Sequence, residues 1–113
     1  MPHTPPCTAD CTACPRLSAF LAENRATLGA DYHNKPVDGF GDVAAPMLIV
    51  GLAPGLHGAN KTGRPFTGDA SGDFLYQQLF DAGLATKPHA RTADPDMHLI
   101  NCRMTNAVRC VPP

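Results

Sequence analysis

The chain has 113 residues, of which 43% are apolar and 17% charged, and its formal net charge is −1. This length suits one domain with a modest core, and the near-zero charge excludes a globally basic surface while leaving room for a local basic patch. No apolar run reaches the ~18 residues of a membrane span, and the N-terminus lacks the pattern of a signal peptide. We therefore expect a cytoplasmic protein without a membrane partner.

The first half of the chain predicts one helix and one strand. Residues 1–10 are proline-rich and irregular, and residues 15–29 have a helical pattern of apolar side chains that starts with Pro15. Residues 30–45 mix Asp, Asn, Pro and Gly and are predicted to be a loop. Residues 46–52 contain a short apolar run, whose length favours a buried strand of a parallel sheet.

The second half predicts a helix and another strand. Residues 72–83 have apolar side chains at helical spacing, residues 85–96 form a polar connection, and residues 97–108 read as a strand interrupted near 101–103. The order strand, helix, strand predicts a right-handed parallel crossover and hence an α/β protein. Ligands of such sheets bind at the carboxyl ends of the strands.

The segment from Gly51 to Gly72 carries the most chemical information. Its sequence, GLAPGLHGANKTGRPFTGDASG, holds six glycines and two prolines between the first predicted strand and the second predicted helix. Such a turn lets backbone N–H groups approach a ligand closely, which predicts an active-site loop. The loop has neither the G-x-x-x-x-G-K-S/T pattern of a P-loop nor the G-x-G-x-x-G pattern of a dinucleotide site.

Each polar or aromatic candidate has a functional and a structural interpretation. Phe66, the one aromatic residue of this loop, either stacks on a planar ligand or fills the core. Asn106 either presents a donor and an acceptor to a base edge or forms an ordinary turn. Asp69 is a catalytic candidate and also, with Ser71, a candidate helix N-cap. His57 in a loop is more often a surface residue than a base.

The cysteines predict a metal site near the N-terminus. Cys11 and Cys14 form a C-x-x-C pair, Cys7 precedes it by four residues, and Cys110 is followed by two prolines. Paired thiolates bind zinc or an iron–sulfur cluster, and the alternative is a pair of buried thiols. Cys102 lies in an apolar strand and is expected to be a small core residue.

Three segments together resemble the uracil-DNA glycosylase superfamily, in its iron–sulfur branch, and look most similar to the bacterial and archaeal family-five type. The matching stretches are CTACPRL at 11–17, the glycine-rich loop at 51–72, and MTNAVRCVPP at 104–113. They span nearly the whole chain. The central motif is long and specific, whereas the flanking motifs alone would not be persuasive.

The resemblance implies a three-layer α/β sandwich with a central parallel sheet flanked by helices. It also implies a hydrolase that removes uracil, and in this branch some other deaminated bases, from DNA. The base would be flipped into a pocket, where water attacks the sugar carbon and the base leaves as an anion. Phe66 would stack on the base and Asn106 would read its edge. The residues assigned to substrate binding are Gly51, Ala53, Pro54, Gly55, His57, Phe66 and Asn106.

The resemblance also implies a cofactor. Cys11, Cys14 and Cys110 would be three ligands of a structural 4Fe–4S cluster, with a fourth cysteine expected beyond Pro113. A His-Pro-Ser type motif, whose histidine stabilises the leaving base, is expected there too. We therefore expect residues 1–113 to be a monomeric, C-terminally truncated single domain that is a poor enzyme alone.

The residue that activates water stays open. Leu52 and Ala53 stand where some relatives have a polar residue after the strand, so activation must come from elsewhere. Asp69 and Asn60 are both candidates, and stabilisation of the sugar cation by the DNA itself is an alternative. Two other classes compete with the enzyme: a non-catalytic iron–sulfur or zinc-binding module for nucleotides or nucleic acid, and a degenerate relative.

Overall fold

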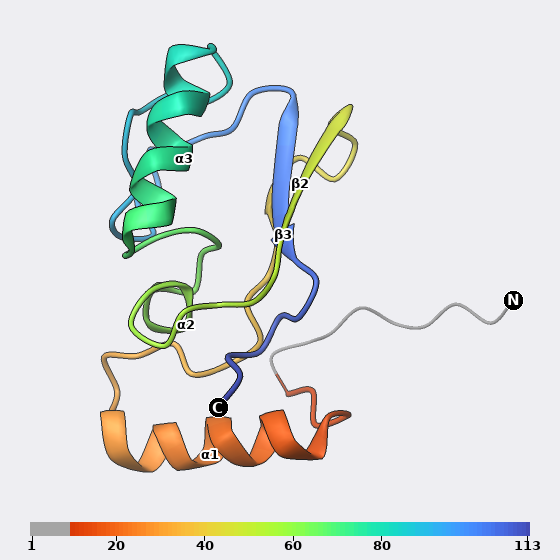
Figure 1. Cartoon of the computed structure of the whole chain (residues 1–113), viewed down its shortest axis with the longest axis vertical. Helices are drawn as coiled ribbons and strands as arrows, with labels where there is room; N and C mark the ends of the chain where they lie inside the picture. Colours follow the sequence, from red (N-terminus) through yellow and green to blue (C-terminus); the bar gives the residue numbers. More distant parts are fainter. Residues whose placement is uncertain (1–9) are drawn as a thin grey trace, which may run out of the picture.

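A computed structural model describes residues 10–113, so the predictions for residues 1–9, including any role of Cys7, lie outside the described part. Three helices and three strands follow one another along this part (Figure 1). Their bounds are α1 Pro15–Leu28, β1 Phe40–Gly41, β2 Met47–Gly51, α2 Ala59–Thr62, α3 Ala70–Asp81 and β3 Cys102–Asn106. Within this range, no helix is both long and apolar enough to cross a membrane.

The sheet has the strand order β1-β3-β2. β2 and β3 are parallel, with Gly51 opposite Asn106, as the strand–helix–strand order predicts. The α/β class is confirmed, with one correction: the sheet is mixed, because β1 pairs with β3 in the antiparallel direction. β1 lies inside residues 30–45, which were predicted to be a loop. Two residues are too few to give a strand periodicity, so only the tertiary pairing reveals this strand.

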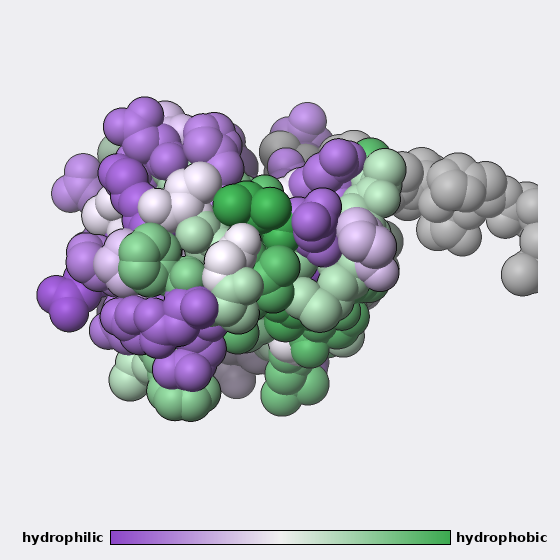
Figure 2. All heavy atoms as spheres, turned by 90° about the horizontal axis from the view of Figure 1, so that it is seen from above, coloured by the Kyte–Doolittle hydropathy of each residue, from purple (hydrophilic) through white to green (hydrophobic). Residues whose placement is uncertain are grey.

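α3 packs on one face of the sheet and forms the main core with it. Tyr76 and Leu79 of the helix lie in one buried cluster with Cys102 and Met104 of β3. The opposite face is more open, and Leu48 of β2 is 57% exposed there. In the view from above, polar side chains gather over the α3 side and apolar ones nearer the strands (Figure 2).

The second predicted strand is shorter than expected. β3 begins at Cys102, whereas residues 97–101 form an irregular segment that bends at its end and in which Leu99 makes a single antiparallel bridge to Ala85. Asn101 has a φ of 58°, a left-handed conformation that a continuous strand does not accommodate. Met97 is still buried, at 1% exposed, because this irregular segment packs against α3 and does not extend the sheet.

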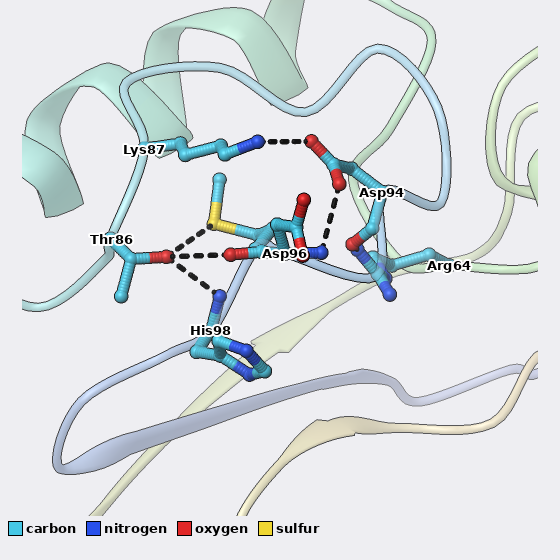
Figure 3. A network of polar contacts seen from close by, with 7 residues as sticks. Arg64, Thr86, Lys87, Asp94, Asp96 and His98 are labelled. Atoms are coloured by element: carbon cyan, nitrogen blue, oxygen red, sulfur yellow. Dashed lines mark hydrogen bonds and ion pairs between the residues drawn. The ribbon is translucent and has the colours of Figure 1, made fainter.

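The connection before β3 is fixed by a polar network (Figure 3). Lys87 donates to the Asp94 carboxylate at 2.7 Å, and Arg64 of the glycine-rich loop donates to the Asp94 carbonyl at 2.6 Å. The Thr86 hydroxyl accepts a hydrogen bond from the backbone N–H of His98 at 2.9 Å. This polar segment is therefore an ordered loop that is tied to the glycine-rich loop through Arg64.

α1 packs apart from the main core. Leu21 forms a separate buried cluster with Cys110 and Val111, so the segment after β3 lies over this helix (Figure 1). The helix ends at Leu28 and Gly29 follows it, close to the predicted bounds. Cys110, which follows β3, thus packs against the helix whose N-cap residue is Cys14.

Candidate active site

A pocket of about 210 Å³ lies at the carboxyl ends of β2 and β3. This is smaller than the roughly 300–1,000 Å³ of a site for a drug-sized ligand, so it suits a single small planar group. Most of the residues predicted to bind substrate meet there. It is lined by Leu52, Ala53, Pro54, Gly55, Ala59, Phe66, Asp69, Ser71 and Asn106.

Gly51 separates the two side chains that were predicted to bind a base. A Cβ atom at this position would lie 2.4 Å from Cζ of Phe66 and 2.5 Å from Oδ1 of Asn106. No side chain fits between them, so a glycine is required at the end of β2 for both groups to approach each other. Since Asn106 is the register partner of Gly51, strand pairing itself sets this arrangement.

Phe66 lies in a constrained backbone conformation between the pocket and the core. Its φ is 60°, which is unusual for a bulky residue. The Tyr76 hydroxyl donates to the Pro65 carbonyl at 2.8 Å, and a Cβ at Gly72 would lie only 1.8 Å from the Phe66 carbonyl oxygen. Phe66 packs on the main core and also lines the pocket. Its position agrees with the structural interpretation and leaves the ring at the pocket wall, and a strained residue held by such contacts is typical of a functional site.

Asp69 has the position of an N-cap, and it also lies on the pocket wall. Its Oδ1 accepts the backbone N–H of Gly72 at 2.9 Å and the hydroxyl of Ser71 at 3.0 Å. Its Oδ2 faces the opposite way, 3.4 Å from the Cβ that would be built at Gly55. One oxygen is thus used by the helix, while the other points to the glycine-rich turn.

The structure does not bring Asn60 to this pocket. Asn60 is fully buried in α2, where its Nδ2 donates to Oδ1 of Asn34 at 2.9 Å. The backbone N–H of Asn34 donates in turn to the Asn60 carbonyl at 3.0 Å. Its neighbour Ala59 lines the pocket instead. The arrangement gives Asn60 an anchoring position, since it fixes α2 to the segment after α1.

His57 is also placed differently from the prediction. It is exposed, and its Nδ1 lies 2.7 Å from the Tyr32 hydroxyl. It lines a neighbouring hollow and not the pocket that holds Phe66 and Asn106. Sequence reasoning missed Tyr32 because the contact joins residues 25 positions apart, and no local pattern marks such a pair.

The predicted metal ligands lie around one helix. Cys14 is the N-cap residue of α1, Cys11 lines a shallow hollow beside Leu21, and Cys110 is buried against the same Leu21. Within residues 10–113, however, no three His, Cys, Asp or Glu side chains form a group that could hold a metal ion. The thiol chemistry suits a metal or cluster, and the described ligand set is incomplete.

Cys102 differs from the other cysteines. It is 1% exposed in the main core, and burial raises the pKa of its thiol. Because a metal ligand must be the thiolate, this environment opposes metal binding. The prediction that Cys102 is a core residue is confirmed by its position.

The family model and the similar proteins found by comparison all indicate one family. The family model of the uracil DNA glycosylase superfamily matches residues 39–113. A type-5 uracil-DNA glycosylase of Thermus thermophilus is 53% identical over 107 residues, which cover 91% of this chain and 48% of that protein. Proteins of the same name from Mycobacterium leprae and Pyrobaculum aerophilum are 45% and 40% identical, covering 91% and 92% of this chain and 47% of each relative. The chain thus spans about half the length of the curated relatives it matches.

We expect Tyr76→Phe to destabilise the protein by about 1–2 kcal/mol, because the Pro65 carbonyl loses its buried donor. Burial raises the pKa of the Tyr76 hydroxyl. The stability from this hydroxyl is therefore fully present below the unfolded pKa of about 10 and is lost as pH rises above it. Urea unfolding between neutral pH and about pH 11 measures both effects.

Tyr32→Phe is the matched control, since Tyr32 is part-exposed and its hydroxyl contacts the exposed His57. The alkaline loss of stability should persist in this control and be reduced in Tyr76→Phe. Equal pH dependence of the two variants would contradict the assignment.

Proposed function

The chain belongs to the uracil DNA glycosylase superfamily, and from this we propose that it provides the base-binding half of a DNA repair glycosylase. The reaction is hydrolysis of the N-glycosidic bond of uracil, or of another deaminated base, after base flipping. The observation that carries the proposal is the pair Phe66 and Asn106, which face each other across Gly51 in a small pocket. A flipped base needs an aromatic ring to stack on and hydrogen-bonding groups that match its polar edge.

The pocket chemistry supports a flipped pyrimidine. The Phe66 ring offers a stacking surface, and the Asn106 amide offers one acceptor and two donors to the polar edge of the base. Backbone from Gly51 to Gly55 closes the site where a side chain would intrude. Asn106 is only 6% exposed, and a buried setting strengthens the hydrogen bonds that its amide makes.

Asp69 is our candidate for activation of water. In the reaction the bond between the sugar carbon and the base nitrogen breaks, and its electron pair leaves with the base. Water forms the new bond to the sugar carbon and gives its proton to a base such as a carboxylate. Oδ2 of Asp69 lies on the side of the glycine-rich turn and is not used by the helix cap. Asn60, the other candidate, supports the loop from below through Asn34.

We further propose that Cys11, Cys14 and Cys110 ligate a structural 4Fe–4S cluster. Cys11 and Cys110 both lie beside Leu21 of α1, and Cys14 is the N-cap of the same helix, which supports the proposal. Such a cluster would fix α1 to the segment after β3 and would take no part in bond cleavage. The substrate partner is DNA that contains uracil or another deaminated base, bound by a monomeric, cytoplasmic protein.

We expect Asp69→Asn to lower the rate of base release by about 10²- to 10⁴-fold while leaving stability nearly unchanged. Asparagine caps helices about as well as aspartate, so only the charge is removed. The assay is release of uracil from a duplex with a single uracil. It uses a chimera in which this chain replaces the matched half of the Thermus relative.

Asp69→Ala is the control that removes the cap together with the carboxylate, and it should also lose stability. A folded chimera that releases no uracil would oppose the proposed function. An unchanged rate in Asp69→Asn would leave Asp69 as a helix cap only.

Phe66→Ala should weaken binding of a uracil-containing oligonucleotide by about 1–3 kcal/mol, because one base loses its stacking surface. Fluorescence anisotropy with matched uracil and thymine oligonucleotides measures this loss. Phe74→Ala is the matched control, since Phe74 is 69% exposed on α3 and does not line the pocket. Equal affinities of the Phe66 variant and the control would return Phe66 to a purely structural role.

Cys14→Ser and Cys110→Ser should each lose the bound iron, whereas Cys102→Ser should keep it. The reason is that Cys102 lies in the main core, away from α1. Iron content and thiolate-to-iron absorbance are measured on protein prepared without oxygen. Zinc in place of iron, or equal iron in all three variants, would oppose the cluster.

A further inference from the structure

A second hollow, of about 480 Å³, adjoins the base pocket and shares Asp69 with it. Its polar side chains come from the glycine-rich loop, α2, the start of α3 and the connection before β3. His57, Lys61 and Thr62 come from the glycine-rich loop and α2, and Arg91 and Thr92 come from the connection before β3. The base-binding proposal assigns no role to this hollow or to its cationic groups.

Tyr32 holds two of these groups from outside the loop. Nζ of Lys61 lies 5.2 Å from the centre of the Tyr32 ring, and the Tyr32 hydroxyl lies 2.7 Å from Nδ1 of His57. When the hydroxyl donates to Nδ1, the neutral imidazole carries its proton on Nε2 and becomes a donor there. The cation–π contact restrains a lysine that would otherwise sample many rotamers.

The opposite wall is also fixed. Ala90 is buried, at 3% exposed, and Asp94 is held by Lys87 and Arg64 (Figure 3). Arg91 and Thr92 lie between these two fixed points. The network therefore places a guanidinium and a hydroxyl at the hollow without direct contact to the base pocket.

The carboxylates of Asp69 and Asp73 face the same hollow and reduce its positive charge. Asp69 uses its Oδ1 in the cap of α3. Asp73 lies 3.7 Å from Nε of Arg91, in a pair whose side chains are 44% and 77% exposed. An exposed ion pair of this kind contributes little, so an incoming anion can compete for Arg91.

We propose that this hollow binds a backbone phosphate of the DNA strand whose flipped base occupies the pocket. The inference rests on the proposed function and deepens it. A phosphate next to the flipped nucleotide is joined to the base through one sugar, and Asp69 stands between the two sites. Lys61 supplies a point charge, Arg91 a planar donor pair, and the Thr92 hydroxyl a neutral donor.

The test is equilibrium binding of the 113-residue chain to short single-stranded oligonucleotides, one with uracil and one with thymine, across a salt series. Each lost phosphate contact should lower the magnitude of the slope of log K against log salt by about 0.7. Lys61→Ala and Arg91→Ala should each show this change and bind roughly eightfold more weakly at about 50 mM salt. The loss should be the same for both oligonucleotides, because phosphates carry no base identity.

Lys35→Ala and Arg16→Ala are matched controls, since both residues are exposed and neither lines this hollow. Circular dichroism confirms that all four variants remain folded. Slopes that fall no more in Lys61→Ala and Arg91→Ala than in the controls would overturn the phosphate site, as would a chain that binds neither oligonucleotide. A preference for uracil with unchanged salt slopes would contradict the phosphate site and would still support the proposed function. Changed slopes without any uracil preference would support the phosphate site and oppose the proposed function.

Discussion

The parallel pairing of β2 with β3 determines the whole candidate site. The register sets Gly51 opposite Asn106 and brings the Asn106 amide to the face that carries α3 and Phe66. A slip by one residue would turn every side chain of β3 to the other face. Met104 and Cys102, buried on that same face, oppose the slip because it would expose both of them. The core and the base pocket are thus specified by one set of hydrogen bonds.

The glycine-rich loop is an ordered element, and two of its glycines are required because neighbouring groups leave no room for a side chain. Gly51 admits Phe66 beside Asn106, and Gly72 admits the Phe66 carbonyl against the first turn of α3. The strained φ of Phe66 is therefore maintained from two sides, and Tyr76 holds the preceding residue from below. This explains why an aromatic side chain can lie at a pocket wall without collapsing into the core. Its position depends on the backbone of its neighbours more than on its own packing.

Sequence patterns predicted what depends on local or repeated features. The strand at Met47–Gly51, the helix near residues 72–83 and its Asp69 cap follow from an apolar run, a helical spacing and a short polar side chain. Phe66 and Asn106 line one pocket, and they could be expected to lie close together because the carboxyl ends of parallel strands meet at one edge. The positions of His57 and Asn60 could not be predicted, since each is set by a partner more than twenty residues away. β1 was missed for the same reason, because its pairing partner β3 is distant in the sequence.

The near-zero net charge now has a structural explanation. The base pocket has neutral walls apart from Asp69, whereas the adjoining hollow places Lys61 and Arg91 beside Asp69 and Asp73. A strongly basic surface would hold any DNA tightly, whatever base it carries. If the two proposals hold, balanced charges in this hollow would favour a phosphate that arrives together with its flipped base, because only then would both sites gain contacts. The properties of the hollow thus depend on where its charges lie and not on the total charge of the chain.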